Sequence, residues 1–155
     1  MSSRSGAFPL QKVLEFRKHL EDLQAIKLGR AQAEKIEADA RLERLKRNKE
    51  DTLESAAREL NRRKTLDLQQ LKIQKDYLES LNGKIVEQTQ EVFKLEEKVE
   101  KNRQELSEAM KERKTVEKLK ERFLERQKTE NKRRENQKTD EVAIRMNVMR
   151  AKKGA

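Results

Sequence analysis

The chain has 155 residues, of which 33% are hydrophobic, 3% aromatic and 44% charged, and its formal net charge is +10. Ala, Leu, Glu, Lys and Arg make up 92 of the 155 residues, a share typical of long helices and coiled coils. This composition excludes a thick globular core, and it excludes a sheet protein because β-branched and aromatic side chains are too few.

The first predicted helix runs from about residue 9 to residue 62. The opening Phe8-Pro9-Leu10-Gln11 is typical of a helix start, because proline fixes φ where its missing amide hydrogen costs nothing. Small and apolar residues then share one face at spacings built from three and four residues, which indicates a narrow packed seam. Its members are Leu28, Ala31, Ala38, Leu42, Leu45 and Ala56, and Lys35, Lys49 and Thr52 interrupt it.

A bend is predicted at about residues 62–67. Asp67 and Gln70 have the spacing of a capping box, in which Asp67 is the N-cap of a second helix. The dipeptide Asn82-Gly83 is a rival turn candidate, but the heptad pattern passes through it, and a glycine inside a helix costs only about 1 kcal/mol. The alternative to a hairpin is one uninterrupted helix that forms an intermolecular coiled coil.

The second predicted helix, about residues 68–150, has the clearer pattern. Its apolar residues keep alternating spacings of three and four, or multiples of them, over about seven heptads, which is typical of a coiled-coil seam. These residues are Leu71, Leu78, Leu81, Ile85, Val92, Leu95, Val99, Leu106, Ala109, Val116 and Phe123. Polar residues share the seam and should fix the register at some cost in stability. They are Gln74, Gln88, Asn102, Arg113 and Lys120.

The sequence therefore predicts an all-α protein in which residues 1–155 form a single helical hairpin. Two long helices make an antiparallel coiled coil, and the second helix is the longer one, so its end should extend past the start of the first. Residues 125–141 of this end contain no apolar side chain, and apolar residues return only at Val142, Ile144, Met146, Val148 and Met149. Such a stretch either stays solvated or enters a polar partner.

Positive charge gathers in the same part of the chain. Residues 111–155 carry 16 basic and 8 acidic side chains, which is most of the net charge of the whole chain. A basic end should meet something acidic: nucleic acid, an anionic membrane surface or an acidic protein channel. The densest cluster, Lys132-Arg133-Arg134, is either a phosphate contact or a solvated helical face. Nucleic acid is not expected as the partner, because no stacking aromatics or recognisable binding module accompany it.

Catalysis is not expected either. The chain has one histidine, His19, no cysteine and four scattered glycines, and it lacks a phosphate loop or metal-ligand spacing. We therefore expect no enzyme activity, no metal, no cofactor and no small-molecule substrate. No apolar window is long enough to span a membrane, and residues 1–20 lack the apolar core of a signal peptide. These observations and the absence of cysteine predict a protein of the cytoplasm.

Three segments carry a resemblance to a known family. The opening Phe8-Pro9-Leu10-Gln11-Lys12-Val13-Leu14-Glu15, the closing run 119–143 and the pattern Tyr77-Leu78-x-x-Leu81 after the bend resemble the FliJ family. This family is the small coiled-coil component of the bacterial flagellar type III export apparatus. The most specific element is Gln137-Lys138-x-Asp140-Glu141, and the similarity covers nearly the whole chain.

The resemblance implies an antiparallel hairpin similar to the rotor stalk of rotary ATPases. Its partners would be the hexameric flagellar export ATPase, the cytoplasmic domain of the export gate and export chaperones, and its place the cytoplasmic side of the inner membrane. The implied ATPase-facing residues are Lys132, Arg133, Arg134, Gln137, Asp140 and Glu141, to which we add the adaptable Met146 and Met149. The implied gate-facing residues are Tyr77, Leu81, Lys84 and Gln88. Lys84 departs from the family, which often has a smaller residue there.

The sequence also allows other interpretations of these residues and other functions. Leu81 and Gln88 also fit plain packing in the seam, which leaves Tyr77 as the better exposed contact. A basic coiled coil that binds nucleic acid is an alternative function, and its affinity would fall steeply with salt. A structural dimer, in which each chain is one continuous helix, is the third possible function.

Overall fold

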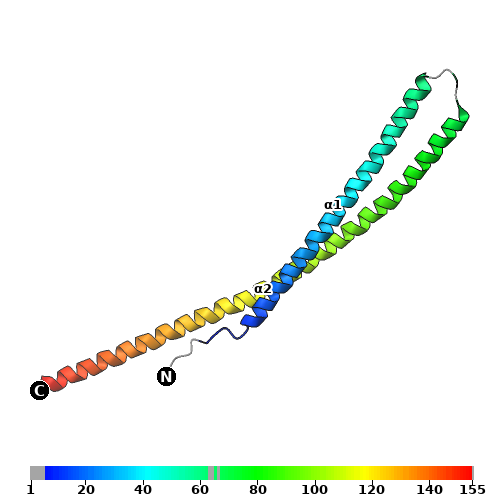
Figure 1. The fold of residues 1–155 in the computed structure, drawn as a ribbon. Helices are drawn as coiled ribbons and strands as arrows, with labels where there is room; N and C mark the ends of the chain where they lie inside the picture. Colours follow the sequence, from blue (N-terminus) through cyan, green and yellow to red (C-terminus); the bar gives the residue numbers. More distant parts are fainter. Residues whose placement is uncertain (1–5, 63–64, 66, 155) are drawn as a thin grey trace. The chain divides into compact units, whose positions relative to one another are not determined.

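The computed structural model describes residues 6–62, 65 and 67–154. Within these residues the chain forms two α-helices and no strand: α1 (Gln11–Arg62) has 52 residues and α2 (Leu68–Lys153) has 86 (Figure 1). The two helices run in opposite directions, and the second is the longer. The predicted fold class, an all-α antiparallel coiled-coil hairpin with a longer second helix, is confirmed.

The first helix begins two residues after the predicted start. Pro9 and Leu10 form a turn, in which the Gln11 amide donates to the Phe8 carbonyl at 3.1 Å. The Leu14 amide then donates to the Leu10 carbonyl at 2.9 Å, so the first helical hydrogen bond already spans the turn. Proline therefore precedes the helix here, and its fixed φ sets the entry of the chain.

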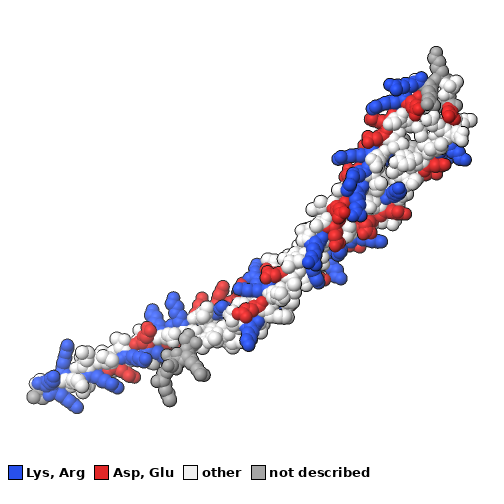
Figure 2. Space-filling model, viewed as in Figure 1, with Lys and Arg blue, Asp and Glu red and all other residues white. Residues whose placement is uncertain are grey.

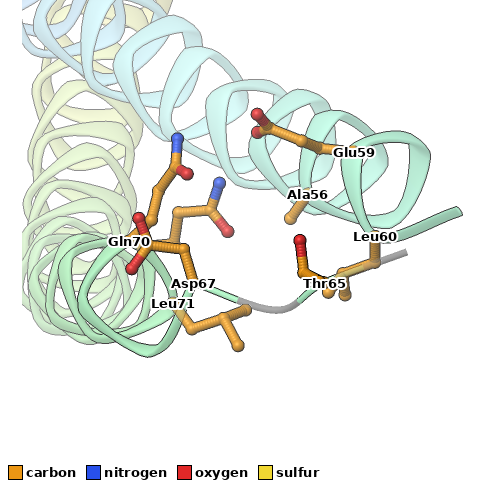
Figure 3. Close-up of a pocket in the computed structure, with 8 residues that line it drawn as sticks. Ala56, Glu59, Leu60, Thr65, Asp67, Gln70 and Leu71 are labelled. Carbon is orange, nitrogen blue, oxygen red and sulfur yellow. The ribbon is translucent and has the colours of Figure 1, made fainter. Parts of the chain in front are cut away.

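The start of α2 confirms Asp67 as the predicted N-cap. Its Oδ1 accepts a hydrogen bond from the Gln69 amide at 3.1 Å, and its carbonyl accepts from the Leu71 amide at 3.1 Å. Both bonds satisfy amides that lack a partner inside the helix. Residues 63, 64 and 66 of the predicted bend lie outside the described residues. A small pocket at this end is lined by Ala56, Glu59, Leu60, Thr65, Asp67, Gln70, Leu71 and Gln74 (Figure 3).

The contacts divide the chain into two units, each of which pairs a part of α1 with a part of α2. Unit 2 is Asp22–Glu108 and holds the bend. Every predicted seam residue in it is buried or half-buried, and the most buried are Ala31, Ala38, Leu42, Leu81 and Val99. The heptad pattern is thus confirmed as the packed face of both helices. That residues 1–155 form a single domain stays a prediction.

Polar seam residues of unit 2 find partners across the interface. The Gln88 amide donates to the Ala38 carbonyl at 3.1 Å, and the Asn102 amide donates to the Lys27 carbonyl at 3.5 Å. Lys35 pairs with Asp39 at 3.1 Å and reaches Glu96 of α2 at 3.6 Å. The Asp39 carboxylate, followed by Glu96, raises the pKa of Lys35 above its ordinary value. Because these bonds form at one alignment only, they fix the register of the two helices.

Unit 1 comprises Met1–Glu21 and Ala109–Ala155. Leu14 and Phe8 are its buried apolar residues, and the Phe8 ring lies 5.6 Å from the Phe123 ring at an interplanar angle of 55°. The Gln127 side-chain amide donates to the Gly6 carbonyl at 2.8 Å. The segment before α1 (residues 6–10), which we call the lead-in, therefore covers the last seam positions of α2. Gln127 is the last half-buried residue of α2, and the described residues after it are exposed.

Ion pairs take the place of apolar packing at the other end of unit 1. Arg113 occupies a seam position and binds the carboxylate of Glu21 on α1 and that of Glu117 on its own helix, the latter at 2.5 Å. The hydrogen bonds that the guanidinium donates to these carboxylates, Glu21 first, raise its pKa above the ordinary value. Arg17 of α1 pairs with Glu112 close by. The sequence pattern marked Arg113 as a polar seam residue, and the structure supplies its partners.

Two glycines inside the helices offer a test of helix stability. Gly29 and Gly83 are exposed, and a Cβ added at either would meet no atom within 4 Å. Replacing each with alanine should therefore raise the free energy of unfolding by about 1 kcal/mol, because alanine restricts the unfolded chain and favours the helix. Urea unfolding followed by circular dichroism measures the change. The matched reverse change, Ala57→Gly at an exposed helical site, should lower stability by a similar amount, and stabilisation by it would contradict the argument.

Candidate functional site

The end of α2 is a single helix that no other described segment of the chain covers. All residues from 128 to 154 are exposed, and the helix continues unbroken to Lys153. This part, which we call the free end (residues 128–153), carries nine basic and four acidic side chains. Lys and Arg side chains project above and below it in Figure 2. A helix with this charge and no hydrophobic cover is a surface for an acidic partner.

All eight predicted ATPase-facing residues lie on this free end. Each one is exposed, and Arg134 is held by an ion pair with Glu130 at 3.3 Å. Arg134, Gln137 and Glu141 lie on the same side of α2 as the seam residues that pack on α1 earlier in the helix, because they keep the three-and-four spacing of the seam. The structure thus places these residues on one accessible helix, and their role in binding stays a prediction.

The apolar side chains of the free end point to two opposite sides. Val142, Met146 and Met149 recur every three or four residues and share one side, while Ile144 and Val148 share another. Residues two positions apart on a helix point about 200° away from each other, so the two groups face opposite ways. All five are exposed. A flat surface or a one-sided groove would cover only one of these groups.

The boundary of the free end was not found from the sequence. The sequence pattern indicates Phe8 only as part of a helix start, whereas the Phe8–Phe123 contact and the Gln127–Gly6 hydrogen bond mark where the paired part of α2 ends. The available signal was that Phe123 is the last apolar seam residue before the stretch 125–141, which has no apolar side chain, and that Phe8 is the first large apolar residue after Met1.

The predicted gate-facing residues fall into two groups. Tyr77 and Lys84 are exposed, whereas Leu81 is only 3% exposed and Gln88 is half-buried and bonded to Ala38. Leu81 and Gln88 therefore belong to the helix interface, as their seam spacing indicated. Only Tyr77 and Lys84 are accessible to a partner while α1 covers α2.

In the described part of the chain, no group of three or more His, Cys, Asp or Glu side chains is placed to hold a metal ion. His19 is exposed on α1. Among the same residues, neither helix contains a stretch apolar enough to cross a bilayer.

The paired helices and the uncovered basic end define the class of antiparallel coiled-coil hairpin proteins. Residues 6–153 match the family described as Flagellar FliJ protein, so the chain belongs to the FliJ family. It is accordingly a component of the flagellar export apparatus, with a place in flagellum biogenesis and protein export. The resemblance drawn from the sequence is confirmed. No curated protein and no solved structure matches the chain.

Proposed function

We propose that this protein is a central-stalk-like coiled coil that binds and stimulates the hexameric flagellar export ATPase. The observation that carries the proposal is the free end: one exposed helix with a basic shaft and apolar residues on two opposite sides. A ring surrounds what it binds and can contact both sides at once. The shaft residues Lys132, Arg133 and Arg134 would meet acidic groups of the pore, and Met146 and Met149 would pack deeper inside.

The same proposal assigns the part of α2 that follows the bend to the export gate. Tyr77 and Lys84 are the accessible members of the predicted gate site. Leu81 and Gln88 would act indirectly by holding α2 against α1, so that Tyr77 keeps its position. The chain would couple the ATPase to the cytoplasmic domain of the gate, and assist export chaperones, at the cytoplasmic side of the inner membrane. The ATPase would perform the chemistry, and this chain would bind no cofactor.

The test is ATP hydrolysis by the flagellar export ATPase of the same organism, with and without this protein, at low and high salt. We expect faster hydrolysis and more hexamer at substoichiometric amounts of the protein, because one stalk serves one ring. Added DNA should not reduce the effect. An unchanged rate, together with DNA binding that weakens steeply with salt, would favour a nucleic-acid-binding protein instead.

A further inference from the structure

An apolar face on α2 of unit 2 lies away from the seam. Val86 is 56% exposed and Phe93 is 60% exposed, and their spacing of seven residues puts them on one side of the helix. Thr89, Gln90, Phe93 and Lys94 line a shallow hollow on this side. Phe93 and Val86 thus expose apolar surface two turns apart on the same side of α2. We call it the Phe93 face (Val86, Thr89, Gln90, Phe93, Lys94).

The surroundings of the Phe93 face are acidic, although the chain is basic. Residues 76–100 carry seven acidic and three basic side chains, against a net charge of +10 for the whole chain. Glu79 lies before Val86 and Glu97 after Phe93 on the same side of the helix. Glu79 forms an ion pair with Lys75 at 3.7 Å, and both side chains are exposed. A complementary partner would be a helix with an apolar stripe and cations at both ends of it.

The free end of this chain is such a helix. Val142, Met146 and Met149 form an exposed stripe whose ends are seven residues apart, as are Val86 and Phe93. Cations stand at both ends of the stripe: Lys138 before it, and Arg150 and Lys153 after it. Methionine side chains adapt their shape and pack well against an aromatic ring, so the two surfaces agree in spacing, charge and chemistry.

We propose that the free end of one copy docks on the Phe93 face of a second copy. Both surfaces belong to the same unbroken helix, which cannot fold back on itself, so the occupant has to come from another molecule. The contact is heterologous, because it joins two different surfaces. However many copies associate in a row, one free end and one Phe93 face remain open at the ends of the assembly. Since the free end is also the part that we assign to the ATPase ring, the ring and the second copy would compete for it.

The test compares two variants of the full chain by sedimentation equilibrium at about 0.15 M salt, where the screening length is about 8 Å and long-range repulsion is weak. The wild-type mass should rise with concentration. Phe93→Glu and Met146→Glu should each weaken this association at least about tenfold, because each puts a carboxylate into the apolar contact. Mixed together, they should form a one-to-one pair, since the first keeps a working free end and the second a working Phe93 face.

The control is Ile36→Glu, which makes the same charge change at a side chain that is 69% exposed on α1. This variant should associate like the wild type, and circular dichroism should show unchanged helicity in all three. A wild-type chain that stays monomeric, a mixture that stays monomeric, or an equal loss with Ile36→Glu would each overturn the proposal. Phe93→Glu should still stimulate the ATPase, so that failure of self-association is distinguishable from failure of the proposed function.

Discussion

A chain that ends after Gln127 is expected to lose all stimulation of the export ATPase and yet keep its paired helices. The change removes the free end, whose residues 128–153 are all exposed. Its effect on the free energy of unfolding should therefore stay below about 0.5 kcal/mol. ATP hydrolysis and urea unfolding of the same preparation measure the two effects. Retained stimulation would place the ATPase contact elsewhere in the chain.

A second variant keeps the free end and changes only its charge. Reversing Arg133 and Arg134 to glutamate should weaken the apparent affinity for the ring at least about tenfold, because like charges would then face each other. The matched control reverses Arg30 and Arg47, two exposed arginines of α1, which gives the same net charge. An equal loss with both pairs would show that net charge alone governs the interaction.

The second large effect is expected in the seam. Leu81→Ala should lower the free energy of unfolding by about 2–3 kcal/mol, because Leu81 is almost fully buried and the space left cannot be refilled. Leu68, which is 79% exposed at the start of α2, is the matched control. Its replacement by alanine should cost less than about 0.5 kcal/mol. Equal costs at the two sites would contradict the packing described for unit 2.

This comparison also bears on the gate. If Leu81 acts by holding α2 in place, gate binding should fall in Leu81→Ala in step with the loss of helical structure. A Tyr77→Ala variant, altered at an exposed side chain, should lose gate binding with its helices intact. Measuring binding and circular dichroism on both variants distinguishes direct contact from support.

The packed faces of both helices could be predicted because each depends only on the spacing of apolar residues along its own helix. The heptad spacing alone places Leu81, Val99 and Ala38 on the packed side. Asp67 was found for a similar reason, since a cap depends on residues within one turn of it. Such features need no knowledge of the second helix.

The side chains that meet across the two helices could not be predicted individually. The predicted bend at residues 62–67 sets the approximate alignment of α1 and α2, but a bend known only to within a few residues does not say which side chains lie opposite each other. For this reason the Arg113–Glu21 ion pair, the Phe8–Phe123 contact and the Gln127–Gly6 hydrogen bond came only from the structure. The accessible residues of the candidate site could be predicted only in part for the same reason. Whether a residue such as Gln88 is free or bonded depends on what lies opposite.

The lead-in to α1 has a mechanical consequence. A single helix is about 10–12 Å wide with its side chains, and two packed helices, whose axes are 8–10 Å apart, are nearly twice as wide. A channel just wide enough for one helix would therefore admit the chain as far as Gln127, where the backbone of Gly6 and the ring of Phe8 widen it. These few residues would act as a depth stop, which sets how much of the protein can enter a pore.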